Sequence, residues 1–382
     1  RRQAPSPSRD FVAALSSCSR SRRMTALRAA RAVDCRCALT THLFAHSVSR
    51  HFDYSDEEGF RRAHAELLAS LGAERAGALL AELAAESRRR SSLEEDARSR
   101  TEAIRAGWRS ARPELYTLQP SHLDPRFIHL AELARSERAP GALAPLFSRE
   151  PCRTEAAAVL LELGVRRLDA VLLVYEMPVL APKYCEALCA ELADFERSGL
   201  PSSRPNSMNR HGLLLSELGF SPMLDALLGE YVAPLAAMLF PEAGGGSLDT
   251  YRAFTVKYTP DDDPSLALHF DNAEVTLNVC IGERRQAGSA VVEAKAEPGF
   301  EGGELLFGGL NSGGPQTPTL ALEHSVGRAV LHLGKHMHQA LPVSSGTRIN
   351  LVVWCRSSAI RRCFGCPMCG RKDQLLDPAD TE

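Results

Sequence analysis

The chain has 382 residues, which is room for roughly two domains of ordinary size, and 44% of its residues are hydrophobic, enough for a sizeable core. Its formal net charge of -2 gives no indication that the molecule as a whole binds nucleic acid or lipid. We predict no transmembrane helix, because we find no run of about 18 apolar residues and the longest candidate, LDAVLLVYEMPVLAP, contains Glu176.

The first fifty residues differ in composition from the rest of the chain. They hold ten Arg and two acidic residues among many Ser and Ala. This composition resembles an organelle transit peptide, and it is also typical of a disordered basic tail. We predict disorder for residues 1–54.

Helical periodicity dominates the next segment, 55–167. Residues 57–112 are predicted to be helical, since leucines recur at helical spacing in two apolar stripes, namely Leu67, Leu68 and Leu71, then Leu79, Leu80 and Leu83. Residues 113–167 hold several prolines between short apolar groups, which indicates a small helical region. We therefore predict a mainly helical N-terminal region that packs on the strand-rich part of the chain after residue 167.

Strands are expected from residue 168 onwards. The stretch LDAVLLVYEMPVL predicts one or two strands, and two helices come after it. The first helix runs from Pro182 to a stop at Gly199. The second begins at Ser221 and Pro222, a capping residue followed by a favourable first helical residue, and runs towards Phe240.

Short strands fill residues 251–356. YRAFTVKY and EVTLNVCI alternate between two faces, and GGELLFGG, RAVLHLG, HQALPV and INLVVWC are each bounded by Gly, Pro or Ser. Several short strands separated by turns favour an all-β sandwich or barrel, with a jelly roll as one option. We predict one domain over 168–358, with its core at 251–356 and two helices packed outside.

One of these strands carries an unexpected pair of polar residues. In LALHFDNAEVTLN, His269 and Asp271 are two residues apart and therefore share a strand face. Burying a carboxylate is costly unless it is paired or binds a metal. The stretch therefore indicates either a metal site or a structural ion pair.

The second half of the strand region offers partners for this pair. LHLGKHMHQALPVSSGTRINLVVW contains His332, His336 and His338, with Arg348 after a turn. Two His and one carboxylate from separate strands can bind one face of an octahedral ferrous ion and leave three positions open. The HxD pair together with a later His and an Arg is far more specific than an isolated HxD.

Residues 251–356 resemble the 2-oxoglutarate and iron(II)-dependent oxygenases of the prolyl 4-hydroxylase and lysyl hydroxylase type. The motif that carries the resemblance is HxD, a long gap, then H-x-x-x-P-x-x-x-G-x-[RK], which here is His269 and Asp271, then His338, Pro342, Gly346 and Arg348. The resemblance extends over about 170–370 through RPNSMNRHG, RAFTVKY, HFDNAEVTLNV, NLVVW and CPMC, and more faintly into the helical part.

The resemblance implies an α+β fold, in which a double-stranded β-helix (jelly-roll) catalytic domain with supporting helices comes after a mainly helical N-terminal region. It implies His269, Asp271 and His338 as catalytic iron ligands, with His336 as the alternative to His338. It implies Arg348 as the cation for the far carboxylate of 2-oxoglutarate, since a guanidinium offers a bidentate fork. Tyr258 resembles family tyrosines that bind this cosubstrate, although a core tyrosine is an equal interpretation.

Other polar residues near the motif have weaker assignments. We predict His332 to be a strand residue satisfied by a hydrogen bond, and His324 to be exposed. Thr276 and Asn278 share a polar strand face that could line the same cavity. The loop PSSRPNSMNRHGLLL, residues 201–215, is either a substrate entrance edged by Asn206, Asn209 and Arg210 or a capped surface loop.

The cysteines indicate the cellular compartment of the protein and a candidate zinc site. The odd count of 11 Cys, without a small-domain disulfide spacing, favours a reducing compartment and an intracellular location, cytoplasmic or nuclear. The C-terminal tail 359–382 holds Cys363, Cys366 and Cys369. A zinc site needs four ligands, and Cys355 is the candidate for the fourth; free thiols are the alternative interpretation.

The function implied by the resemblance is hydroxylation of a substrate C–H bond with release of succinate and CO2. The implied cofactors are Fe(2+), 2-oxoglutarate and, as an auxiliary, L-ascorbate. The implied partners are 2-oxoglutarate, O2 and an unidentified protein substrate hydroxylated at a residue such as prolyl or lysyl, with no nucleic acid. The alternatives are a catalytically inactive jelly-roll binding module and a structural ion pair at the motif.

Overall fold

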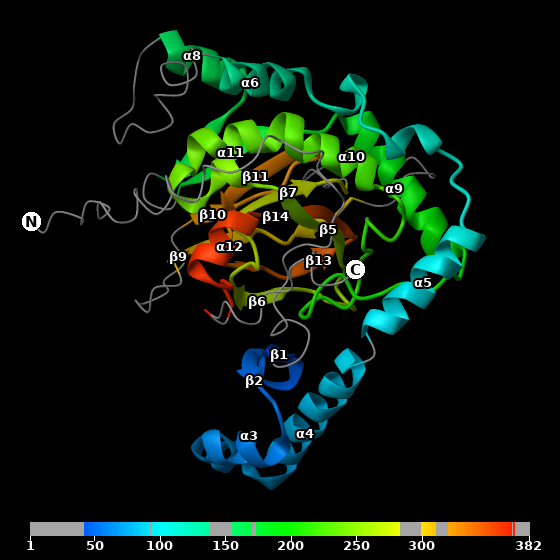
Figure 1. The fold of residues 1–382 in the computed structure, drawn as a ribbon, viewed down its shortest axis with the longest axis vertical. Helices are drawn as coiled ribbons and strands as arrows, with labels where there is room; N and C mark the ends of the chain where they lie inside the picture. The colour runs from blue at the N-terminus through cyan, green and yellow to red at the C-terminus, as the bar shows by residue number, and fades with distance from the viewer. Residues whose placement is uncertain are drawn as a thin grey trace, which may run out of the picture.

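The computed structural model describes residues 42–91, 93–136, 155–169, 173–282, 299–310, 320–368 and 370, and it combines helices with antiparallel sheets (Figure 1). The fold is α+β. The helices come mainly from the first half of the described chain and the long strands from the second half, as the sequence predicts.

The described chain begins with a hairpin. Strand β1 (His42–Ala45) pairs antiparallel with β2 (Arg50–Asp53), and their buried apolar side chains join leucines of α4 in a small core. The predicted disorder of 1–54 is therefore wrong for this part, because the composition of the whole segment conceals a local apolar alternation. Residues 1–41 lie outside the described residues.

Three helices come after the hairpin (Figure 1). They are α3 (Glu57–Ala63), α4 (Ala65–Ser91) and α5 (Leu93–Gly107), which confirms the helical periodicity of 57–112 up to Gly107. Asp56 caps α3, since its carboxylate accepts a hydrogen bond from the backbone of Gly59 at 2.7 Å. Gly72 interrupts the helical backbone of α4 at a φ of 76°.

The hairpin and helices α3 to α5 form what we call the helical arm. Short elements connect this arm to the sheets. They are two 3-10 turns, η2 (Pro113–Tyr116) and η3 (Pro120–His122), and helices α6 (Pro125–Arg135) and α8 (Glu155–Glu162). Asp124 caps α6 through the backbone of Arg126, and α6 packs against α11.

Two antiparallel sheets form the second half of the molecule. The larger has the order β3 (Arg166–Asp169), β4 (Val174–Pro178), β11 (Arg328–Leu333), β7 (Val275–Cys280), β14 (Arg348–Arg356), β5 (Thr250–Tyr258). The smaller has the order β10 (Leu320–Leu322), β9 (Leu305–Leu310), β12 (His336–Ala340), β6 (Leu266–His269). A two-stranded ladder joins β8 (Glu301–Gly302) to β13 (Val343–Ser345).

The two sheets share one hydrophobic core. Phe254, Val330 and Val352 of the larger sheet belong to the same buried cluster as Phe307 and Ala340 of the smaller sheet. The sheets therefore lie face to face, and side chains at the ends of facing strands can converge.

Helices cover the other face of the larger sheet (Figure 1). They are α9 (Pro182–Arg197), α10 (Ser221–Ala226), a π-helical turn η5 (Leu227–Val232) and α11 (Ala233–Leu239). The apolar face predicted for the first of them is buried at Cys185, Leu188, Leu192 and Phe195.

Residues Ser221–Leu239 form one continuous helical stretch that is long and apolar enough to cross a membrane by length and composition. This stretch contains Asp225 and Glu230 and is therefore not an uninterrupted apolar run, so the absence of a transmembrane helix stays a prediction. The core helix of a water-soluble protein meets the same criteria, and the apolar residues of this stretch pack into the cluster against the larger sheet.

Helix α12 (Ser358–Phe364) is the last helix among the described residues. The hydroxyl of Ser357 caps it by accepting a hydrogen bond from the backbone of Ile360 at 3.2 Å. Its Arg361 is fully buried, which places the helix against the sheets rather than in a free tail.

Candidate metal centre

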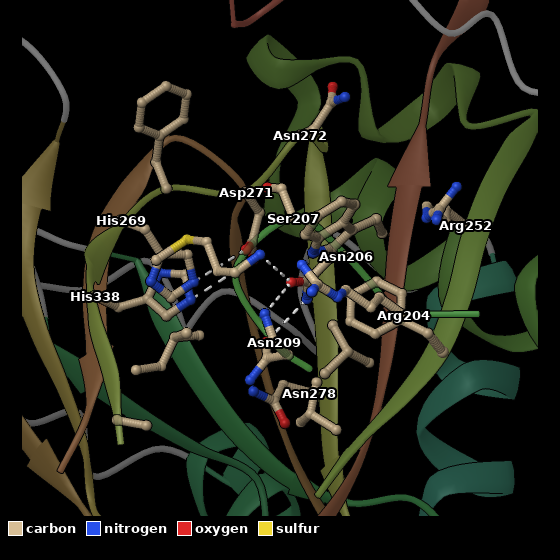
Figure 2. Close-up of a pocket in the computed structure, with 18 of the residues that line it drawn as sticks. Arg204, Asn206, Ser207, Asn209, Arg252, His269, Asp271, Asn272, Asn278 and His338 are labelled. Carbon is tan, nitrogen blue, oxygen red and sulfur yellow. Dashed lines mark hydrogen bonds and ion pairs between the residues drawn. The ribbon is translucent and has the colours of Figure 1, made fainter. Parts of the chain in front are cut away.

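Three ligand side chains converge between the two sheets at one end of the smaller sheet. His269 ends β6, His338 lies opposite it in β12, and Asp271 comes two residues after β6. The Nε2 atom of His269 is 3.6 Å from Oδ1 of Asp271, and Nε2 of His338 is 3.7 Å from Oδ2. One ligand atom from each residue lies within 4.8 Å of the other two, and all three residues are buried (Figure 2).

Hydrogen bonds aim the ligand atoms at a common point. The Nδ1 atom of His269 lies 2.8 Å from the carbonyl of Ala267, and Nδ1 of His338 lies 2.9 Å from the carbonyl of His336. Each Nδ1 therefore carries the proton, which leaves the Nε2 lone pairs for a ligand. Thr276 donates to Oδ2 of Asp271 at 2.7 Å and holds the carboxylate in place.

The protonation states also suit a cation. Burial lowers the pKa of His269 to about 4, with the neighbouring His338 acting in the same direction, so the ring is neutral at pH 7. Burial alone would raise the pKa of Asp271, but the adjacent imidazoles and the Thr276 hydrogen bond outweigh it, and the pKa is lowered. Two imidazoles and one carboxylate are the donor set that a ferrous ion takes in non-haem oxygenases.

Hydrogen bonds from other elements clamp the loop after Asp271 in place. The backbone of Asp271 donates to the carbonyl of Gly334 at 2.8 Å, and a Cβ on Gly334 would lie 1.9 Å from the carbonyl oxygen of Ala273, so only glycine fits there. Arg361 of α12 donates to the buried Glu274 and to the carbonyl of Asn272. The C-terminal helix thus supports the loop that carries the carboxylate.

The geometry distinguishes the other histidines near the motif from the two that converge. His338, and not the alternative His336, belongs to the convergent group. His332 is buried in β11, and its Nδ1 lies 2.9 Å from the carbonyl of Leu333, as predicted for a satisfied strand residue. Its Nε2 lies 3.9 Å from Asp271 and has no hydrogen-bond partner within the described ranges. The predicted exposure of His324 is wrong: it is 4% exposed because it packs against Arg348.

Arg348 lies at the inner end of the same pocket. It is 1% exposed, its Nε donates to Oδ1 of Asn350 at 3.0 Å, and its Nη2 donates to Nε2 of His324 at 2.8 Å. The guanidinium lies 4.9 Å from the ring centre of Tyr258, which lines the same pocket. Asn350 in turn donates to Asn278 at 2.6 Å, so an amide and imidazole network fixes the orientation of the fork.

The pocket extends outward from the three ligands to the loop 201–212. Asn206 and Asn209 of this loop line it (Figure 2), whereas Arg210 faces a separate surface depression. Asn278 lines the pocket too, and Thr276 reaches it only through Asp271.

Sequence patterns missed several other residues of this pocket. Arg204 and Arg252 lie on its wall, away from His269 and His338 (Figure 2), and Arg89 and Arg90 reach it from α4. Arg204 and Arg252 begin the stretches RPNSMNRHG and RAFTVKY, but the sequence does not show that they meet in one pocket, because the four arginines come from elements far apart in the chain. The clamping role of Arg361 is likewise invisible without the packing of α12.

The cysteine tail remains open as a second metal site. Cys363 and Cys366 lie near the end of α12 and are in no disulfide with another described residue, and Cys355 is buried in β14. The proposed third tail ligand, Cys369, lies outside the described residues.

Comparisons with known proteins agree with these features. An OGFOD2-like domain model matches residues 104–245. The human 2-oxoglutarate and iron-dependent oxygenase domain-containing protein 2 is 38% identical over 353 residues, which cover 90% of each chain. The human multifunctional procollagen lysine hydroxylase and glycosyltransferase LH3 is 29% identical over 194 residues, which cover 47% of this chain and 23% of that protein.

A solved Pseudomonas putida prolyl-4-hydroxylase aligns over 49% of this chain and 89% of its own, with 18% identity and a TM-score of 0.33, a likeness too weak to add to the sequence match. The human match spans the helical arm, the sheets and the ligand motif together. The chain therefore belongs to the family of 2-oxoglutarate and iron-dependent oxygenase domain-containing protein 2, the group within the oxygenase superfamily that RPNSMNRHG, RAFTVKY and CPMC resemble.

Proposed function

We propose that this chain is an Fe(II)- and 2-oxoglutarate-dependent dioxygenase that hydroxylates a C–H bond of a peptidyl residue, such as prolyl or lysyl, and releases succinate and CO2. The observation that carries the proposal is one buried pocket holding both the His269, Asp271 and His338 group and the Arg348 fork. The family name supplies the dependence on iron and 2-oxoglutarate.

The three ligand residues would hold the ferrous ion. Their donor atoms face one another, the rings are fixed through Nδ1, and Asp271 is ionised, so the site needs neither rotation nor loss of a proton to accept a dication. When bound, the ion would supply the activation of O2 that no protein side chain can provide.

Arg348 would orient 2-oxoglutarate. Its guanidinium is pre-ordered by Asn350 and His324, so little side-chain freedom is lost when a carboxylate pairs with it. Tyr258 lies beside the fork and would donate its hydroxyl to the same cosubstrate. The buried walls would exclude water from the reacting end.

The finer expectations belong to the same proposal. The facing sheets would be the two halves of a double-stranded β-helix, or jelly roll, and L-ascorbate would serve as an auxiliary reductant. A peptidyl substrate is favoured by the similarity to a procollagen lysine hydroxylase. The proposed location is intracellular, cytoplasmic or nuclear, and it rests on the odd cysteine count without a small-domain disulfide spacing.

The proposed division of the chain rests on the packing. The helical region would include the hairpin from residue 42, the oxygenase domain would span 168–358, and the tail would begin at 359. The buried Arg361 of α12 supports the oxygenase domain from that tail.

Metal-dependent turnover of 2-oxoglutarate tests the proposal directly. The purified chain is loaded anaerobically with Fe(II) and 2-oxoglutarate, exposed to O2, and assayed for succinate, with a lysate then searched for peptides that have gained one oxygen atom. We expect stoichiometric iron binding and slow uncoupled succinate formation. A chain that binds no iron and forms no succinate would instead be an inactive binding module, and the proposal would fail.

A further inference from the structure

The outer part of the pocket carries arginines that the proposed chemistry does not use. Arg204 comes from the loop 201–212, Arg252 from β5, and Arg89 and Arg90 from α4. Among the described residues that line the pocket, Asp271 is the one carboxylate, and it belongs to the ligand group. The entrance is therefore much more basic than the chain as a whole, whose net charge is -2.

One carboxylate partly balances this charge from behind. Glu86 on α4 accepts hydrogen bonds from Arg89 at 2.7 Å and Arg90 at 2.9 Å, and it lies 3.7 Å from Arg204. Burial would raise the pKa of Glu86, but the two arginine hydrogen bonds outweigh it and lower the pKa to about 2. Glu86 thus faces three guanidiniums, and Asp96 also acts on Arg89. The Arg204 side chain, the most distant of the three from Glu86, stays 37% exposed.

A second basic group lies on the opposite wall. Arg252 and Trp354 are directly paired across β5 and β14 and therefore share a face. Arg252 donates to the carbonyl of Pro205 at 3.2 Å and, within the part of the chain that the structure describes, makes no ion pair. The Trp354 Nε1 atom is buried and finds no hydrogen-bond partner among the described residues, and an indole N–H can only donate. This wall offers donors to an incoming acceptor.

Resting on the proposed function, we propose that the entrance binds an acidic segment of a polypeptide substrate, with its carboxylates against Arg204 and Arg252 and the target side chain directed towards His269 and His338. Guanidiniums pair with carboxylates through two parallel hydrogen bonds, so they fix orientation as well as charge. A nucleic acid is less suited, because the sequence pI is about 6.7 and the basic charge is confined to the pocket mouth.

This arrangement also gives the helical arm a role. Because α4 supplies Glu86, Arg89 and Arg90, the arm completes one side of the entrance that the sheets alone would leave open. Substrate selection would then depend on residues outside the oxygenase motif.

Fluorescence anisotropy with short labelled peptides tests the inference on the full chain. The peptides alternate Glu with Ala around one Pro and one Lys, and matched peptides carry Gln or phosphoserine in place of Glu; a single-stranded oligonucleotide serves as the nucleic-acid probe. We expect the Glu peptide to bind at least about tenfold more tightly than the Gln peptide and to weaken as salt is raised. The phosphoserine peptide reveals whether phosphate oxygens serve as well as carboxylates.

The variant pair Arg204→Gln with Arg252→Gln should weaken the Glu peptide about tenfold, since two partly exposed charge pairs are lost. Arg210→Gln, which removes the same charge from the same loop outside the pocket, is the matched control and should bind like the wild type. Equal binding of the Glu and Gln peptides, or tighter binding of the oligonucleotide, would overturn the inference on the wild-type chain even if the double variant does not fold.

Metal binding in the same preparations separates the two proposals. Calorimetric titration with Mn(II), then with 2-oxoglutarate, reports on the inner site alone. Normal titrations without a preference for the Glu peptide would overturn only the acidic-substrate inference. Absent titrations in the wild type would overturn the proposed function, whichever peptide binds.

Discussion

The inner and outer ends of the pocket are built in different ways. At the inner end, His269 and His338 face each other in register across β6 and β12, and each ring is fixed by a carbonyl two residues away. At the outer end, Arg204, Arg252 and Glu86 come from a loop, a strand and a distant helix, and partly exposed ion pairs and a hydrogen bond hold them. The placement of the two histidines at the inner end therefore depends on strand register, whereas the entrance depends on how separate elements dock.

This contrast predicts how each end responds to mutation. Changes to His269, Asp271 or His338 at the inner end should abolish metal binding with modest effects on docking. Changes at the entrance should alter substrate binding or stability by small, additive amounts.

Asp271→Ala should have the largest effect. It removes the one carboxylate of the ligand group, so the affinity for Fe(II) or Mn(II) should fall by more than about 100-fold, beyond the loss typical for an outer-shell partner. Calorimetric titration measures this metal affinity. Asp262→Ala, which deletes an exposed carboxylate, is the control, and a destabilised variant that still binds metal would favour the structural ion pair.

Arg361→Met should lower the stability of the protein, because it removes the side chain that clamps the loop after Asp271. Glu274 would stay buried without its guanidinium, which costs about 3–5 kcal/mol of unfolding free energy. Urea denaturation measures the loss. The exposed neighbour Arg362→Met should cost little, and equal losses in the two variants would refute the clamp.

Arg348→Lys should separate cosubstrate binding from metal binding. A lysine keeps the charge but loses the fork, so the KM for 2-oxoglutarate should rise about 10-fold to 100-fold. Steady-state succinate formation gives the KM, and metal titration without 2-oxoglutarate is the control. A fall in metal affinity of the same size would show that Arg348 supports the centre instead.

Arg100→Gln should have the smallest effect and reports on the docking of the arm. Arg100 on α5 makes a bidentate pair with Glu217, at 2.9 and 2.6 Å, in which both side chains are 11% exposed. Its loss should cost about 1 kcal/mol. A double-mutant cycle with Glu217→Gln measures the coupling, and a coupling near zero would mean that the pair does not hold the arm.

Sequence reasoning predicted the inner end better than the outer. The HxD spacing, the later His and the Arg after Gly346 are local patterns. The shared strand face predicted for His269 and Asp271 is wrong, because β6 ends at His269 and Asp271 comes from the loop after it. His324 was misjudged because its environment is Arg348 and Asn350, residues that a turn-like local sequence does not reveal. The hairpin at 42–53 was missed because a basic composition outweighed a short alternation.

Residue spacing was enough to predict the candidate ligand set, the long strands of the second half and the helical arm, because such patterns lie within short stretches of the chain. Only the tertiary structure decided that Arg361 backs the Asp271 loop and that Arg204, Arg252 and Glu86 meet at one entrance. Such meetings depend on the packing of whole elements, and no short-range periodicity encodes which surface of one element another will cover.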